Sequence, residues 1–165
     1  WLTGQLAKEF DHNYFCVDIN LTELEQAARV FENENIKLIY TDIFSTTFPA
    51  NTFDILIINS SLQYFFFFFL LMKELFFISK TYGEVHIIDT PFYNSYELMH
   101  AKNRTLKYYT SLGYPEMVSK YFHHSLEDFK YLRYKFLYNP QSIKNKLSGF
   151  MFDQDSPFPW LVVTR

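Results

Sequence analysis

Short apolar runs alternate along this chain with longer segments in which apolar residues recur every three or four positions. Four nearly continuous apolar runs are predicted to be strands, at 13–18, 36–41, 53–59 and 83–89. Three segments with helical spacing are predicted to be helices, at 1–10, 21–33 and 62–80. Apolar runs with few polar interruptions are typical of parallel strands that are covered on both faces. The order therefore predicts an α/β fold with a doubly wound, mainly parallel sheet and helices on both faces.

The pattern changes after Pro91. Residues 94–113 and 115–132 are predicted to be mainly helical, and the apolar stretch 158–165 is predicted to be a final, antiparallel strand. Pro157 comes just before this stretch and Pro159 is its second residue, which favours an edge strand. No repeat or linker interrupts the sequence, so we predict one domain over residues 1–165.

Polar residues follow three of the predicted strands. Asp18 and Asp42 each close an apolar run, and Asn59, Ser60 and Ser61 close a third. Open parallel sheets bind their ligands outside the carboxyl ends of the strands. A carboxylate there can accept hydrogen bonds from two ribose hydroxyls or from an exocyclic amine such as that of adenine. The alternative is that each acid only caps the helix that follows it.

Composition narrows the class of protein. The chain has 165 residues, 48% of them hydrophobic and 20% charged, with a net charge of −3, as expected of a soluble globular protein. We expect no nucleic-acid partner and no membrane partner, because no cluster of Lys and Arg is present. The single cysteine, Cys16, excludes an internal disulfide and favours a reducing, cytoplasmic environment.

The apolar stretch 64–72 is too short to cross a bilayer, which takes about 20 residues. It is interpreted as a helix with an apolar face. The alternative that the run Phe65–Phe69 is a sequence artefact stays open.

Several segments resemble class I S-adenosylmethionine-dependent methyltransferases. The resemblance lies in the order and spacing of "FCVDIN", "LIYTDIFSTTFPANTFDILIINSSLQYF" and "GEVHIIDTPFY". It covers residues 1–93, and it implies a cofactor-binding core there and a helical substrate cover with the last strand over residues 94–165. It implies S-adenosylmethionine as cofactor and methyl transfer to an unidentified, small-molecule acceptor by in-line displacement.

The resemblance also implies roles for the matching residues. Asp18 would hold the ribose hydroxyls, and Ile19 would pack against adenine. Asp42 would bind the adenine amine, with the backbone of Ile43 beside it. The methionine part would lie over Asn59 and Ser60, with Ser61, Gln63 and Tyr64 at the mouth facing the substrate.

Two features depart from the family pattern. The glycine-rich loop that follows the first strand in the family has no counterpart, since Trp1 already starts a helical segment. We therefore expect the chain to be a fragment that lacks its first strand and this loop. "NSSL" also differs from the Asn-Pro-Pro-aromatic motif of methyltransferases acting on adenine or glutamine amino groups, which argues against those acceptors.

Candidate catalytic groups are Tyr64, His123 and His124, which could accept a proton from the nucleophile. We expect no metal site, because two adjacent histidines on a helix point in different directions and make a poor metal site. The alternative functions are an inactive Rossmann-like protein kept for protein binding and a nicotinamide-dependent oxidoreductase. The spacing of Asp42 and the segment "FPANTFD" favour a methyltransferase over an oxidoreductase.

Overall fold

The computed structural model describes residues 1–45, 48–142, 145 and 156–165. Residues 46–47 of the predicted loop, and residues 143–144 and 146–155 of the predicted substrate cover, lie outside the described residues. Contacts define two compact units, an N-terminal unit (Trp1–Phe48) and a C-terminal unit (Pro49–Arg165). The organisation of the chain as one domain stays a prediction.

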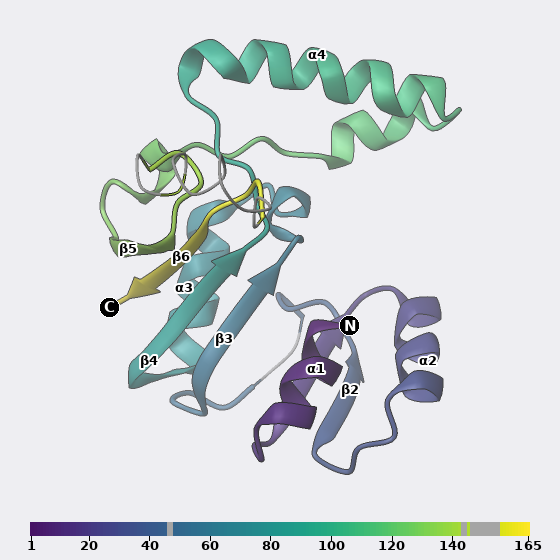
Figure 1. The fold of residues 1–165 in the computed structure, drawn as a ribbon, viewed down its shortest axis with the longest axis vertical. Coiled ribbons are helices and arrows are strands. Elements are labelled where there is room, and N and C mark those ends of the chain that lie inside the picture. Colours follow the sequence, from purple (N-terminus) through teal and green to yellow (C-terminus); the bar gives the residue numbers. More distant parts are fainter. Residues whose placement is uncertain (46–47, 143–144, 146–155) are drawn as a thin grey trace. The chain divides into compact units, whose positions relative to one another are not determined.

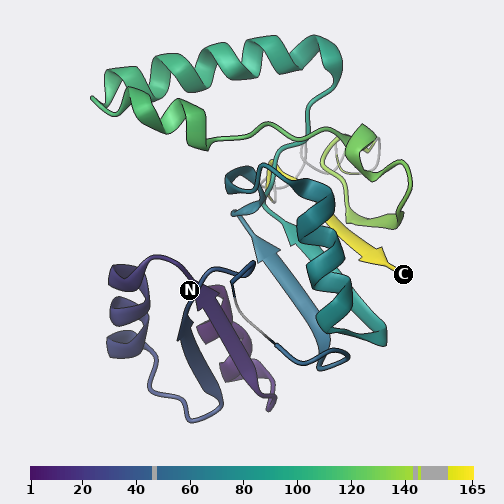
Figure 2. The ribbon, with the colours of Figure 1, turned by 180° about the vertical axis from the view of Figure 1, so that it is seen from behind.

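The N-terminal unit is a βαβ unit preceded by a helix (Figure 1). Its elements are α1 (Leu2–Glu9), β1 (Tyr14–Asp18), α2 (Leu21–Val30) and β2 (Ile36–Tyr40). The two strands are parallel and in register, from Tyr14 opposite Ile36 to Asp18 opposite Tyr40, so their carboxyl ends lie side by side (Figure 2). The side chain of Asn20 accepts a hydrogen bond from the backbone N–H of Glu23 and caps α2.

The C-terminal unit holds a four-stranded sheet. Its elements are β3 (Phe53–Asn59), η1 (Leu62–Tyr64), α3 (Phe68–Ile78), β4 (Ser79–Ile88), α4 (Ser95–Ser111), η2 (Pro115–Lys120), η3 (Leu126–Phe129), β5 (Arg133–Tyr138) and β6 (Trp160–Thr164). The strand order is β3-β4-β6-β5. β3 and β4 are parallel, whereas β6 is antiparallel to both of its neighbours. The α/β fold with parallel strands and a C-terminal antiparallel strand is confirmed.

The core of this unit lies between α3 and the middle of the sheet. Leu71 and Leu75 are four residues apart on α3 and share one buried face of the helix. α3 packs against β4, where Val85 and Ile87 alternate inward and are fully buried. Leu161 of β6 is also fully buried, so the antiparallel strand is part of the core.

An irregularity interrupts the pairing of β3 with β4. Phe53 pairs with Ser79, but Ile55 pairs with Glu84, so the register shifts between them. Gly83 lies in the extra stretch of β4, where a Cβ atom would come within 3.0 Å of the Phe53 carbonyl oxygen. The close approach of the two backbones therefore favours glycine at this position.

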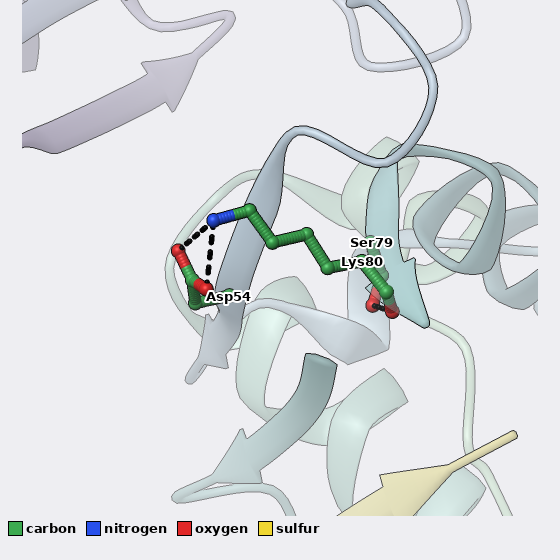
Figure 3. Close-up of polar contacts among 3 residues, drawn as sticks. All are labelled: Asp54, Ser79 and Lys80. Carbon is green, nitrogen blue, oxygen red and sulfur yellow. Dashed lines mark hydrogen bonds and ion pairs between the residues drawn. The ribbon is translucent and has the colours of Figure 1, made fainter. Parts of the chain in front are cut away.

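An ion pair lies at the same irregularity (Figure 3). The Nζ atom of Lys80 lies 2.8 Å from both carboxylate oxygens of Asp54. The hydroxyl of Ser79 donates a hydrogen bond of 3.1 Å to the backbone carbonyl of Lys80. Because both charged side chains are largely exposed, we expect the pair to contribute no more than about 1 kcal/mol to the free energy of unfolding.

The predicted helix 62–80 is interrupted. η1 ends at Tyr64, the chain continues without helix through Phe67, and α3 spans only Phe68–Ile78. β4 begins at Ser79, before the predicted start of the strand, because residues at its amino end pair with β3. In the part of the chain that the structure describes, no helix combines the length and apolarity that crossing a bilayer requires.

The prediction of a second helix over 115–132 is wrong. This region holds two short 3₁₀ turns, η2 and η3, and the segment between them is not helical. The prediction of an edge strand at the C-terminus is also wrong, because β6 lies between β4 and β5. Pro157 and Pro159 precede β6 and so do not remove hydrogen bonds from it. β5, which the sequence pattern does not predict, pairs with β6 along the outer side of the sheet.

Candidate active site

In the N-terminal unit, two carboxylates follow the carboxyl ends of the paired strands. One oxygen of Asp18 accepts a hydrogen bond of 2.8 Å from the backbone N–H of Asn20. One oxygen of Asp42 accepts a hydrogen bond of 2.9 Å from the backbone N–H of Phe44. Among the described residues, the second oxygen of each carboxylate has no hydrogen-bond partner. Each carboxylate is therefore held by a local turn and still has an acceptor oxygen for a ligand.

The residues that follow these acids differ in exposure. Ile19 is 70% exposed, which leaves a large apolar side chain at the strand end available to a ligand. Ile43 is half-buried. An exposed isoleucine beside a carboxylate that accepts hydrogen bonds offers an apolar surface to a flat base and polar contacts to the attached sugar.

In the C-terminal unit, the ends of β3 and β4 are also adjacent. Asn59 pairs with Ile88, and the backbone N–H of Ser60 donates a hydrogen bond of 3.0 Å to the Ile88 carbonyl. Ser60 has a φ of 49° and Asp89 a φ of 52°, both in the left-handed region that residues other than glycine seldom occupy. Backbone strain of this kind clusters at functional sites. Asp89 also accepts a hydrogen bond of 2.7 Å from the hydroxyl of Ser156.

The η1 turn that follows β3 is held in place by the 121–124 segment. The backbone N–H of Phe122 donates to the carbonyl of Gln63 at 2.7 Å, and the Gln63 side chain donates to the carbonyl of Ser60 at 2.6 Å. The Nε2 atom of His124 donates to the carbonyl of Leu62 at 3.0 Å. Two of these bonds join the 121–124 segment to η1, and the third joins η1 to the end of β3.

Four tyrosines and a histidine lie together beside η1. The ring of Tyr121 lies 6.1 Å from those of Tyr64 and Tyr109 and 5.2 Å from that of His123. The ring of Tyr93 lies 5.3 Å from that of His123. Burial, together with the neighbouring tyrosines, raises the pKa of Tyr121 to about 12, so its hydroxyl stays protonated at neutral pH.

His123 is placed to act as a neutral imidazole. Burial lowers its pKa below the ordinary value of 6.5, and the positive charge of Lys102 acts in the same direction. Its Nε2 atom shares a hydrogen bond of 2.9 Å with the hydroxyl of Thr105, which fixes the orientation of the ring. A neutral and oriented imidazole can accept a proton.

His124 lies in a different environment from its neighbour. Its side chain is buried, and burial lowers its pKa. Its Nε2 atom is bonded to the backbone of Leu62, and its Nδ1 atom lies 3.7 Å from a carboxylate oxygen of Asp128. These contacts link η1 to η3 and favour a positioning role over proton transfer.

Of the predicted catalytic residues, the structure brings Tyr64 and His123 together through the ring of Tyr121. Tyr121 and Tyr109 also belong to this cluster, although the sequence pattern does not predict them as site residues. The position of Tyr121 directly before "FHH" is the one sequence signal that indicates its membership. The partial burial of Tyr121 depends on the contact with η1. Among the described residues, no group of three His, Cys, Asp or Glu side chains could hold a metal ion.

Comparisons with known proteins identify the family of the chain. Residues 1–87 match the family model described as a methyltransferase domain. No curated protein sequence matches the chain at a significant level.

Solved structures share the fold at low sequence identity. The chain is similar to YcgJ from Bacillus subtilis, with 15% identity over 99% of this chain and 88% of YcgJ and a TM-score of 0.65. It is also similar to an S-adenosylmethionine-dependent methyltransferase from Mesorhizobium loti, with 11% identity over 99% of this chain and 84% of that one and a TM-score of 0.65. A third similar structure is the plantazolicin methyltransferase BpumL, with 14% identity over 98% of this chain and 71% of BpumL and a TM-score of 0.61.

The family match, the parallel strands with acids at their carboxyl ends and the similarity to these structures lead to one assignment. The chain belongs to the methyltransferase domain family and is a class I S-adenosylmethionine-dependent methyltransferase.

Proposed function

We propose that the protein transfers the methyl group of S-adenosylmethionine to a nucleophilic atom of a small organic acceptor. The observation that carries this proposal is the pair of carboxylates at the adjoining ends of β1 and β2. Asp18 and Asp42 each keep one oxygen without a partner among the described residues, which fits the donor groups of an adenosine. The cofactor supplies the electrophilic methyl group when it is bound.

In this proposal, the N-terminal unit binds the adenosine part. Asp18 accepts hydrogen bonds from the ribose hydroxyls, and the exposed side chain of Ile19 packs against the base. Asp42 accepts a hydrogen bond from the adenine amine beside the backbone of Ile43. These four roles follow from strand-end position and family membership.

The C-terminal unit is proposed to supply the remaining groups. Asn59 and Ser60, at the end of β3, bind the methionine part. His123 accepts a proton from the nucleophile, because burial lowers its pKa and keeps the imidazole neutral at neutral pH. The hydroxyl of Tyr64 orients the acceptor, since this side chain is half exposed and contacts the half-buried ring of Tyr121. His124 positions η1.

Two considerations support a small acceptor. BpumL has been solved with a pentazolic desmethylPZN analog together with SAH, so this fold accommodates organic molecules of that kind. The chain has a net charge of −3, which gives no general attraction to a nucleic-acid acceptor. A cytoplasmic location stays a prediction.

Calorimetric titration of S-adenosylhomocysteine tests the cofactor site. Asp18→Asn keeps the size of the side chain and its turn but replaces a charged acceptor, so we expect binding to weaken about 10- to 100-fold. Glu25→Gln is the matched control, because it removes the same charge from an exposed position of α2 in the same unit. We expect this control to bind like the unmodified protein.

Equal binding by Asp18→Asn and Glu25→Gln would contradict the role of Asp18. No binding by any of the three folded proteins would contradict the proposal that residues 1–165 hold the cofactor without the glycine-rich loop of the family.

A further inference from the structure

A groove of about 690 Å³ opens on the C-terminal unit, between residues 66–70 and residues 118–124. Its volume falls in the range of about 300–1,000 Å³ that is usual for small-molecule sites. Five phenylalanines and one tyrosine line it, together with a few polar side chains. We call it the aromatic groove.

Three phenylalanines of this groove have largely exposed side chains. Phe66 is 63% exposed, Phe67 62% and Phe69 54%, whereas Phe68 between them is buried at 5%. Phe68 therefore anchors the segment in the core, and its neighbours present their rings to the groove. Several large apolar side chains exposed side by side are typical of a binding surface.

The walls of the aromatic groove are held by contacts within the unit. The ring of Phe66 lies 4.7 Å from that of Phe67 and 5.0 Å from that of Phe122 on the opposite side. The ring of Phe68 lies 4.6 Å from that of Phe129. Rings held by other rings lose little freedom when a ligand binds, so the groove is pre-organised.

The groove is also continuous with the proposed catalytic groups. Tyr121 and His123 belong to its lining, and both are members of the tyrosine cluster beside η1. The backbone N–H of Phe122, another lining residue, donates to the carbonyl of Gln63 in η1. A molecule seated in the groove therefore lies against His123, the residue proposed to deprotonate the acceptor, and against Tyr121, whose ring lies 6.1 Å from that of Tyr64.

Few charges face an occupant. His123 and His124 are neutral at neutral pH, because burial lowers the pKa of both. Asp128 already accepts a hydrogen bond of 2.9 Å from the backbone N–H of Ser125. Lys102 is exposed and keeps its hydration. An uncharged occupant suits these walls better than an ion, since the walls offer little to replace the ion's hydration shell.

We propose that the aromatic groove binds the methyl acceptor and that this acceptor is a flat, uncharged aromatic molecule. The reason for preferring an aromatic molecule to an alkyl chain is the geometry of the walls. The rings of Phe66 and Phe67 meet at 72°, and those of Phe66 and Phe122 at 55°, so both faces and edges are presented. Faces and edges together favour offset stacking and edge-to-face contacts with another ring. The identification of the occupant as the methyl acceptor rests on the proposed function. The preference of the groove for a flat aromatic molecule does not.

The test is a fluorescence titration with N-phenyl-1-naphthylamine, an uncharged aromatic probe that brightens in apolar sites. We expect saturable binding of one probe per chain, displaced by 2-naphthol and much less by 1-dodecanol. Phe66→Ala should weaken binding about tenfold, because it removes a ring from the wall. Phe66 is mostly exposed, so the variant should fold.

Phe77→Ala is the matched control. Phe77 is 55% exposed and lies on α3, the helix that follows Phe66, but it is not part of the groove lining. We expect it to bind the probe like the unmodified protein. Equal loss in both variants, unchanged binding by Phe66→Ala, or absence of probe binding would overturn the inference.

Two further outcomes would also overturn it. Equal displacement by 1-dodecanol would indicate an alkyl-chain site, and co-sedimentation with phosphatidylcholine vesicles that Phe66→Ala abolishes would indicate a membrane surface. Asp18→Asn separates this inference from the cofactor site. We expect that variant to keep probe binding while losing affinity for S-adenosylhomocysteine. Absence of probe binding in both the unmodified protein and Asp18→Asn would overturn the inference about the groove, even if the unmodified protein binds S-adenosylhomocysteine.

Discussion

Ser60 and Asp89 both follow the carboxyl ends of neighbouring parallel strands, and both have a backbone φ near 50°. The residues just before them, Asn59 and Ile88, are paired in register, so the two strained positions lie at the same edge of the sheet. Each is a polar residue other than glycine where glycine would be less strained. Such strain persists where a site needs the chain to turn sharply at a fixed place.

Substitution of Ser60 tests whether this strain is real. Ser60→Val puts a β-branched side chain at a φ of 49°, so we expect the free energy of unfolding to fall by about 1–3 kcal/mol. Ser61→Val is the control, because Ser61 has a φ of −130°, outside the left-handed region. Urea denaturation measures both. Equal losses would show that the left-handed conformation carries no special cost.

The sequence predicted the strands that end in polar residues better than the elements that follow them. β1, β2 and β3 were predicted within one residue at each end, because each is a continuous apolar run bounded by polar residues. The acids at the ends of β1 and β2 followed from the same pattern, since parallel pairing places both carboxyl ends at one edge.

The missed features depend on contacts between distant parts of the chain. β5 alternates charged and aromatic residues, and its pairing with β6 fixes it as a strand. Tyr121 is half-buried because the 121–124 segment is hydrogen-bonded to η1. The predicted helix over 62–80 is interrupted at Phe65–Phe67, and the exposed rings of Phe66 and Phe67 line the aromatic groove. Local periodicity contains none of this information.

Substitution of Gly83 tests the close approach of β3 and β4 at their irregular pairing. A Cβ atom there would contact the hydroxyl of Ser79 and come within 3.0 Å of the Phe53 carbonyl and 3.1 Å of the Asp54 carbonyl. We expect Gly83→Ala to lower the free energy of unfolding by about 1–3 kcal/mol, because two backbone segments must move apart. Gly83→Ala combined with Ser79→Ala should recover only part of this loss, since the backbone contacts remain. Unchanged stability in thermal denaturation would contradict the close approach.

Substitution of Trp160 tests a side-chain hydrogen bond between β6 and β4. Its indole N–H donates to Nδ1 of the buried His86 at 2.9 Å, and Nε2 of that histidine lies 3.0 Å from a carboxylate oxygen of Glu84. Trp160→Phe leaves Nδ1 without its donor, so we expect a loss of about 1–3 kcal/mol in the free energy of unfolding. The control is Trp1→Phe, because Trp1 is 82% exposed. Similar losses in the two variants would show that the bond contributes little.

The pH dependence of stability tests the burial of His124. Its folded-state pKa lies below the ordinary value of 6.5, chiefly because of burial, so the unfolded chain binds the proton more tightly. The contribution of this group to stability is therefore complete above pH about 6.5 and decreases as the pH falls toward the folded-state pKa. His124→Gln keeps an N–H donor for the Leu62 carbonyl but does not titrate. We expect its melting temperature to fall less than that of the unmodified protein between pH 7 and pH 5, as thermal denaturation would measure. Because His123 has a lowered pKa as well, some dependence should remain in the variant. Identical pH profiles for the two proteins would contradict a neutral, buried imidazole at position 124.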